Sequence, residues 1–152
     1  MAEYIYNDVQ LIQPGSAAIL ETAIGCNRGY VLHRAGSGIL TLRGIVNNPC
    51  GRFARYRVAY DGNIAVPEGG TAGEIQLALA IDGEVVPTST AAATPTVVNA
   101  YWNVSGFAII DVPAGCCYTV SVENASGSAD PSTTPASALN LRNLNVEVTR
   151  LA

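Results

Sequence analysis

Lysine is absent from this chain of 152 residues, and charged residues of both signs are scarce. All eight basic residues are arginine, and charged residues make up 13% of the chain, against roughly 25% in an ordinary soluble domain. The formal net charge of −4 leaves no basic excess with which to bind nucleic acid, so we expect no nucleic-acid partner. The surface must therefore be kept soluble by uncharged polar side chains or be covered by a partner.

Long apolar runs are also missing. The richest stretch, residues 75–81, stops at Asp82-Gly83, far short of the roughly 20 residues that a membrane-spanning helix needs. Residues 1–8 contain neither a basic nor an apolar segment, so the sequence predicts neither membrane insertion nor export through a signal peptide. A chain of this length usually builds one hydrophobic core, and residues 1–152 are expected to form a single jelly-roll domain on the pattern described next.

Apolar residues recur with the period of two that is typical of β-strands. Residues 55–60 place Tyr56, Val58 and Tyr60 on one face. Arg55 and Arg57 lie on the other face, as in a strand that is buried on one side only. Similar runs predict strands at residues 9–12, 17–20, 30–33, 39–46, 74–81, 107–112, 116–123 and 144–151.

Two turns are predicted to close hairpins. Asp82-Gly83 suits a type I′ turn, in which both central residues need positive φ, and Pro113-Ala114-Gly115 separates the next two runs. Residues 88–95 and 124–137, rich in Ala, Ser, Thr and Pro, are expected to be loops. About ten short strands and no helix predict an all-β fold, an antiparallel β-sandwich of the jelly-roll or Greek-key type.

Residues that carry catalytic or metal chemistry are few. His33 is the only histidine and no Gly-x-Ser-x-Gly motif accompanies it, so we expect no enzymatic activity, no catalytic residues and no cofactor. Cys116 and Cys117 are adjacent and point to opposite faces of a strand, which makes them poor partners for one metal ion. Asp111 and Glu123 are the carboxylates for which the sequence leaves a glycosidase arrangement open.

The four cysteines are expected to be reduced thiols, because the chain shows no export signal. At least one of Cys116 and Cys117 should then pack in the core. The alternative is that Cys26 or Cys50, which both lie among Gly and Asn residues, forms an inter- or intrachain disulfide in an oxidising medium.

The placement of arginine indicates a surface that contacts another protein. Arg52, Arg55 and Arg57 are predicted to lie in one strand, with Arg55 and Arg57 on the same face. A planar guanidinium pairs with carboxylates and carbonyls, which favours arginine at subunit interfaces; simple solubilisation is the alternative. Tyr101 and Trp102, the only tryptophan, form an aromatic pair that is expected in a subunit or capsid interface, or in a loop that stacks on a glycan; packing of Trp102 in the core is a further alternative.

Residues 60–71 and 74–84, with residues 38–44 and 116–122, resemble the compact jelly-roll proteins encoded by tailed bacteriophages and prophages. Their strand spacing and Gly/Pro punctuation are similar to those of the C1q/TNF-like module of virion surface proteins, from about Val9 to Leu151. The resemblance implies a ten-stranded jelly roll that assembles as a homotrimer. It further implies a capsid decoration or cement protein in contact with the major capsid protein.

On this resemblance the protein would lie on the virion surface after assembly in the bacterial cytoplasm. Members of such families usually begin with a stalk, whereas Val9 already belongs to a predicted strand, which favours a trimer docked directly on the capsid. The alternative function is a glycan- or receptor-binding module at a fibre tip or virion surface, with a host surface glycan as its partner.

Overall fold

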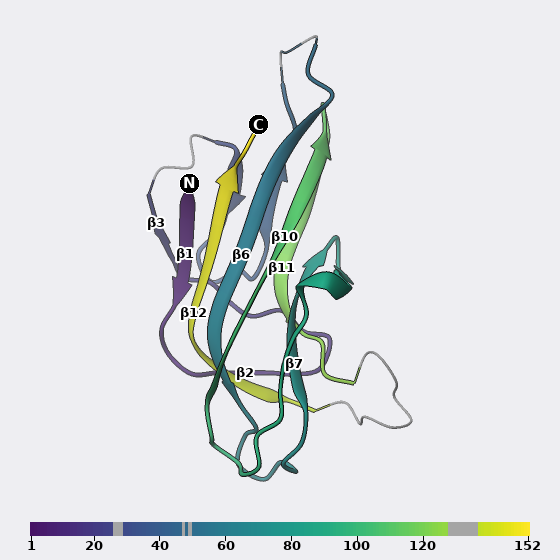
Figure 1. The fold of residues 1–152 in the computed structure, drawn as a ribbon. Helices are drawn as coiled ribbons and strands as arrows, with labels where there is room; N and C mark the ends of the chain where they lie inside the picture. Colours follow the sequence, from purple (N-terminus) through teal and green to yellow (C-terminus); the bar gives the residue numbers. More distant parts are fainter. Residues whose placement is uncertain (26–28, 47, 49, 128–136) are drawn as a thin grey trace.

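Two antiparallel β-sheets pack face to face in the computed structural model, which describes residues 1–25, 29–46, 48, 50–127 and 137–152 (Figure 1). The described residues contain twelve strands and one short 3₁₀ helix, where the sequence predicts about ten strands. In chain order these are β1 (Ala2–Tyr6), β2 (Gln10–Ile12), β3 (Thr22–Ile24), β4 (Val31–His33), β5 (Leu40–Arg43), β6 (Phe53–Ala65), β7 (Ile75–Ile81), β8 (Glu84–Val85), η1 (Pro87–Ser89), β9 (Ala91–Ala93), β10 (Trp102–Pro113), β11 (Cys117–Asn124) and β12 (Leu139–Arg150). The predicted all-β jelly-roll sandwich is confirmed.

The first sheet has the strand order β10-β6-β12-β1-β3, and β2 pairs with the start of β12. β6 and β10 pair along their whole shared length, from Ile64 opposite Trp102 to Phe53 opposite Pro113. β12 lies on the other side of β6 and carries a bulge near Asn143, whose φ is +53° (Figure 1). Because these are the three longest described strands, their outward side chains form one continuous surface.

The second sheet has the order β4-β5-β11-β7-β8, and β9 pairs with the other end of β7. The predicted hairpin between β7 and β8 is confirmed, since Asp82 and Gly83 both have positive φ, +50° and +83°. The Asp82 carboxylate also accepts hydrogen bonds from the backbone N–H and the hydroxyl of Thr119, at 2.8 and 3.0 Å. Asp82 therefore ties the turn to β11.

The second predicted hairpin is wrong. β10 pairs with β6 in the first sheet, whereas β11 pairs with β5 and β7 in the second. Residues 113–116 thus carry the chain from one sheet to the other. A Pro-Gly turn signal predicts that the chain reverses, but it does not determine which strands pair.

Several strand boundaries also differ from the prediction. The strand predicted at residues 17–20 is reduced to isolated bridges at Ala17 and Leu20, and β1 was not predicted. The loop predicted at residues 88–95 contains η1 and β9. The Ser89 hydroxyl, buried, donates to the Val86 carbonyl and accepts from the Leu79 N–H, so this segment is held against β7.

The core fills the space between the two sheets. Its largest fully buried side chains are Tyr4, Tyr56, Leu20, Leu40, Leu42, Ile64, Ile75, Leu77, Leu79, Leu139, Leu141 and Leu144. The buried hydroxyl of Tyr60 lies 2.7 Å from the carbonyls of Leu77 and Ser89, so the polar end of this ring is satisfied. Among the described residues, no helix is long and apolar enough to cross a membrane.

Candidate interaction surface

Arg55 and Arg57 lie on the outward face of β6, as the alternation of residues 55–60 predicts. Tyr56 and Val58, between and beside them, are fully buried. Both arginines are half-exposed and both form ion pairs with neighbouring strands. The structure therefore places these two predicted residues on a surface that β6 shares with β10 and β12.

Arg55 forms a two-pronged pair with Asp111, directly opposite it on β10. Its Nε and Nη2 atoms donate to the two carboxylate oxygens, at 2.7 and 2.8 Å. The hydrogen bond and charge of Asp111 raise the pKa of Arg55, and the hydrogen bond from Arg55 lowers the pKa of Asp111. The guanidinium also lies 5.0 Å from the ring centroid of Phe53. The charges of Arg55 and Asp111 thus neutralise each other, although both side chains stay partly exposed to solvent.

Arg57, two residues further along β6, also contacts a carboxylate and an aromatic ring. Its guanidinium lies 3.6 Å from the Glu147 carboxylate on β12 and 5.2 Å from the ring centroid of Phe107 on β10. The planar arginine groups lie over aromatic rings while carboxylates cancel their charge. The surface therefore exposes apolar side chains, and each of its two arginines is paired with a carboxylate.

We call this surface the β10–β6–β12 face. It consists of Phe53, Arg55 and Arg57 from β6, Phe107, Ile109 and Asp111 from β10, and Glu147 from β12. Phe107 is 55% exposed and Ile109 is 50% exposed, although both lie in the middle of a long strand. Exposed apolar side chains that are interleaved with arginine are typical of protein-binding surfaces.

The other predicted interface residues do not join this face. Arg52 precedes β6, and its carbonyl accepts the Ala114 N–H at 2.9 Å. Trp102, 51% exposed, begins β10, and five residues of extended chain separate it from Phe107, the nearest member of the face, roughly 17 Å. The Tyr101 ring contacts Arg142, whose guanidinium carbon lies 3.8 Å from the ring centroid. Tyr101 and Trp102 therefore form a separate aromatic site at the far end of β10.

Three of the four cysteines, Cys50, Cys116 and Cys117, are free and exposed. The expectation that Cys116 or Cys117 packs in the core is wrong, because Cys116 lies in the turn between the sheets and Cys117 is the first residue of β11. Cys26 lies outside the described residues.

The candidate catalytic residues are held in structural contacts. The His33 Nε2 atom lies 3.0 Å from the Ser37 carbonyl oxygen, and the ring packs edge-on against Tyr4. Asp111 pairs with Arg55 in the first sheet, while buried Glu123 in the second accepts a hydrogen bond from Ser121 at 2.8 Å. Asp111 and Glu123 thus belong to different sheets. No group of three His, Cys, Asp or Glu residues that could hold a metal ion occurs in the described part of the chain.

Phe107, Ile109 and Glu147 were not singled out from the sequence. The signal was present for Phe107 and Ile109, because they alternate with Ala108 and Ile110, and one of the two sets must face outward. Which set does so depends on the partner sheet. The packing of the two sheets decides which set faces outward, and a run of residues that are all apolar does not predict this.

No protein-family model and no curated protein matches this chain. Among solved structures it is similar to the globular domain of the zebrafish complement 1qA protein, with a TM-score of 0.52 and 14% identity over 96% of this chain and 94% of that chain. It is also similar to Eiger TNF from S. frugiperda, with a TM-score of 0.59 and 9% identity over 100% of this chain and 92% of that chain. The fold is thus that of the C1q/TNF-like jelly rolls.

Proposed function

We propose that this C1q/TNF-like jelly roll is a non-enzymatic structural protein that assembles as a homotrimer through the β10–β6–β12 face and decorates a phage capsid. The observation that carries the proposal is the composition of that face. Its exposed apolar residues, Phe107 and Ile109, lie beside arginines whose charges are already paired within the chain. Such a face can be buried against a neighbouring subunit without leaving these charges unpaired.

The assembly must meet the usual size requirement. A stable interface buries roughly 800 Å² on each partner, a small fraction of the 7907 Å² accessible surface of the chain. The number of three copies and the capsid as the site of action come from the resemblance of residues 60–71 and 74–84 to phage jelly-roll proteins.

Two isoleucines of equal exposure allow a matched test of the assembly. Ile109, on the β10–β6–β12 face, and Ile39, just before β5 of the second sheet, are each 50% exposed. We expect Ile109→Asp to reduce the mass in solution to that of one 15.8-kDa chain, because it would replace apolar contact area in the interface by a carboxylate that must lose its water there. Ile39→Asp should leave the trimer intact. Equal masses for the two variants would contradict the assignment of the face.

The capsid role has its own test. Capsids assembled without this protein should bind it in a saturable way and withstand a higher temperature before they rupture. Failure of the purified trimer to bind them would refute the capsid role and leave the assembly unaffected.

A glycan-binding function is the second candidate, and the exposure of Trp102 favours it. Because Trp102 is the only tryptophan and is half-exposed next to Tyr101, its fluorescence reports on this site alone. Stacking of a sugar ring on the indole would quench or shift the emission in a saturable way. An unchanged emission spectrum across host-surface glycans would argue against this function.

A further inference from the structure

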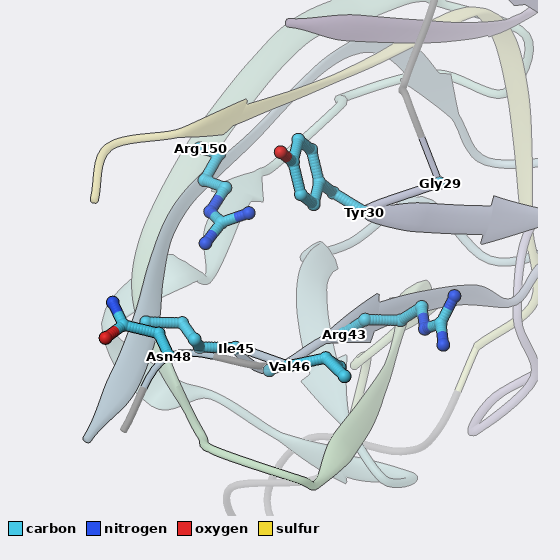
Figure 2. Close-up of a pocket in the computed structure, with 8 residues that line it drawn as sticks. Gly29, Tyr30, Arg43, Ile45, Val46, Asn48 and Arg150 are labelled. Atoms are coloured by element: carbon cyan, nitrogen blue, oxygen red, sulfur yellow. The ribbon is translucent and has the colours of Figure 1, made fainter. Parts of the chain in front are cut away.

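A pocket of about 420 Å³ lies between the end of β12 in the first sheet and segments next to β4 and β5 in the second (Figure 2). Its walls come from Arg150 at the end of β12, from Tyr30 just before β4, and from the segment after β5 that contains Ile45, Val46 and Asn48. A volume of this size is within the range of small-molecule sites. No Asp or Glu side chain is among the described residues that line it.

Arg150 occupies a core-facing position of its strand. The buried residues Leu144, Val146 and Val148 form the inward stripe of β12, and Arg150 is the next residue in that alternation, paired with the buried Tyr56 of β6. Its charged group is therefore directed toward the gap between the sheets rather than outward. Figure 2 shows the guanidinium pointing into the pocket, whereas that of Arg43 points away from it.

The guanidinium of Arg150 is held in place by two contacts. Its carbon atom lies 4.1 Å from the ring centroid of Tyr30, and its Nε donates to an oxygen of Ala152, the last residue of the sequence, at 3.3 Å. The ion pairs found among the described residues are formed by Arg55 and Arg57, and neither involves Arg150. Among the described residues no hydrogen bond from its two terminal nitrogens is found, so they can pair with a planar anion with little side-chain freedom left to lose.

The opposite wall supplies a second donor and an apolar surface. The Asn48 Oδ1 atom accepts the backbone N–H groups of Cys50 and Gly51, at 3.1 and 3.2 Å, which leaves its Nδ2 as a donor. Ile45 and Val46 continue this wall. The guanidinium of Arg150 and the side-chain amide of Asn48 can donate hydrogen bonds to a carboxylate. The aliphatic and aromatic side chains beside them can contact the apolar part of the same small molecule.

We propose that this pocket binds a small organic carboxylate, whose two oxygens pair with the terminal nitrogens of Arg150 while its body lies against Tyr30, Ile45 and Val46. The site does not depend on the proposed trimer, because Arg150 is not part of the β10–β6–β12 face. A failure of either proposal can therefore be recognised separately.

Sodium glucuronate, titrated into the full-length protein and followed by backbone amide chemical shifts, tests the site. We expect saturable shifts centred on Tyr30, Gly44 and Ile45, and none from glucose, which lacks the carboxylate. Arg150→Gln should weaken binding about tenfold or more, the loss expected for charge-assisted hydrogen bonds. Arg142→Gln is the matched control: Arg142 also stacks on a tyrosine and lies on the same strand, but it does not line the pocket, so binding should be unchanged.

Arg150→Lys keeps the positive charge and removes the fork, so it should fold and bind more weakly than the parent chain. The proposal is overturned if glucuronate causes no saturable shifts, or if Arg150→Lys or Arg150→Gln binds it as the parent does. Equal shifts from sodium chloride or inorganic phosphate at the same concentration would also overturn it, since the pocket would then attract any anion. The mass of the Arg150 variants in solution should equal that of the parent.

Discussion

Replacing Gly106 by alanine is expected to destabilise the fold markedly, although Gly106 lies in an ordinary stretch of β10. Gly106 is paired with Tyr60, and a Cβ atom there would lie 2.4 Å from the Ser89 carbonyl oxygen and 2.9 Å from the Tyr60 hydroxyl. These contacts are too short, and one of them involves backbone. Either η1 or the Tyr60 ring must move, and the hydrogen bond that joins them at 2.7 Å would be lost or strained.

The expected change in the free energy of unfolding is the sum of two losses and one gain. Overpacking costs about 1–3 kcal/mol, and the strained hydrogen bond adds about 1 kcal/mol. Replacement of glycine returns roughly 0.5–1 kcal/mol through the unfolded chain. The net loss in the free energy of unfolding is about 2 kcal/mol, which corresponds to a fall in Tm of about 4–8 °C for a chain of this length.

Thermal unfolding at a fixed protein concentration measures this loss. Gly73→Ala is the control, because its new Cβ would meet nothing closer than the Thr71 carbonyl oxygen at 4.0 Å. Its Tm should stay near that of the parent chain. A Gly106→Ala variant as stable as the Gly73→Ala variant would refute the inferred packing of Tyr60 against η1.

Three further predictions concern single side chains. Tyr60→Phe should lower the free energy of unfolding in urea by about 1–2 kcal/mol, because it leaves a buried carbonyl without its donor. Asp82→Ala should cost about 1 kcal/mol in the same assay, because it loses the bonds to Thr119 and places alanine at positive φ, and Asp82→Asn should cost less. Arg55 lowers the pKa of Asp111, so the stabilisation from this pair is present above the ordinary carboxyl pKa and is lost as pH falls through the folded-state pKa. Carboxyl carbon shifts should show the Asp111 pKa returning to its ordinary range in Arg55→Gln, and an unchanged titration would contradict the pairing.

The alternation of polar and apolar residues was enough to predict the sandwich and the outward direction of Arg55 and Arg57. It underestimated the length of β6, because the alternation is clear only over residues 55–60. In the structure the Gly62 position is crowded by the Leu141 side chain, where a Cβ would lie 2.8 Å from its Cδ1 atom. The glycine thus leaves room for the Leu141 side chain, and a contact with a residue so distant in sequence leaves no local signal.

The interaction surface and the pocket were likewise only partly predictable from the sequence. The sequence places arginines on one face of a strand, but their neighbours Phe107 and Glu147 are brought there by pairing between distant strands. The inward position of Arg150 could have been predicted, because it continues the alternation of Leu144, Val146 and Val148. The pocket beside it could not, since its opposite wall comes from Ile45 and Asn48, about a hundred residues earlier.

The mass of the unmodified chain in solution tests the central claim most directly. Sedimentation equilibrium across the micromolar range should give three times the 15.8 kDa of the chain, because the β10–β6–β12 face is proposed to be buried against further copies. A mass of 15.8 kDa throughout that range would contradict the proposed assembly.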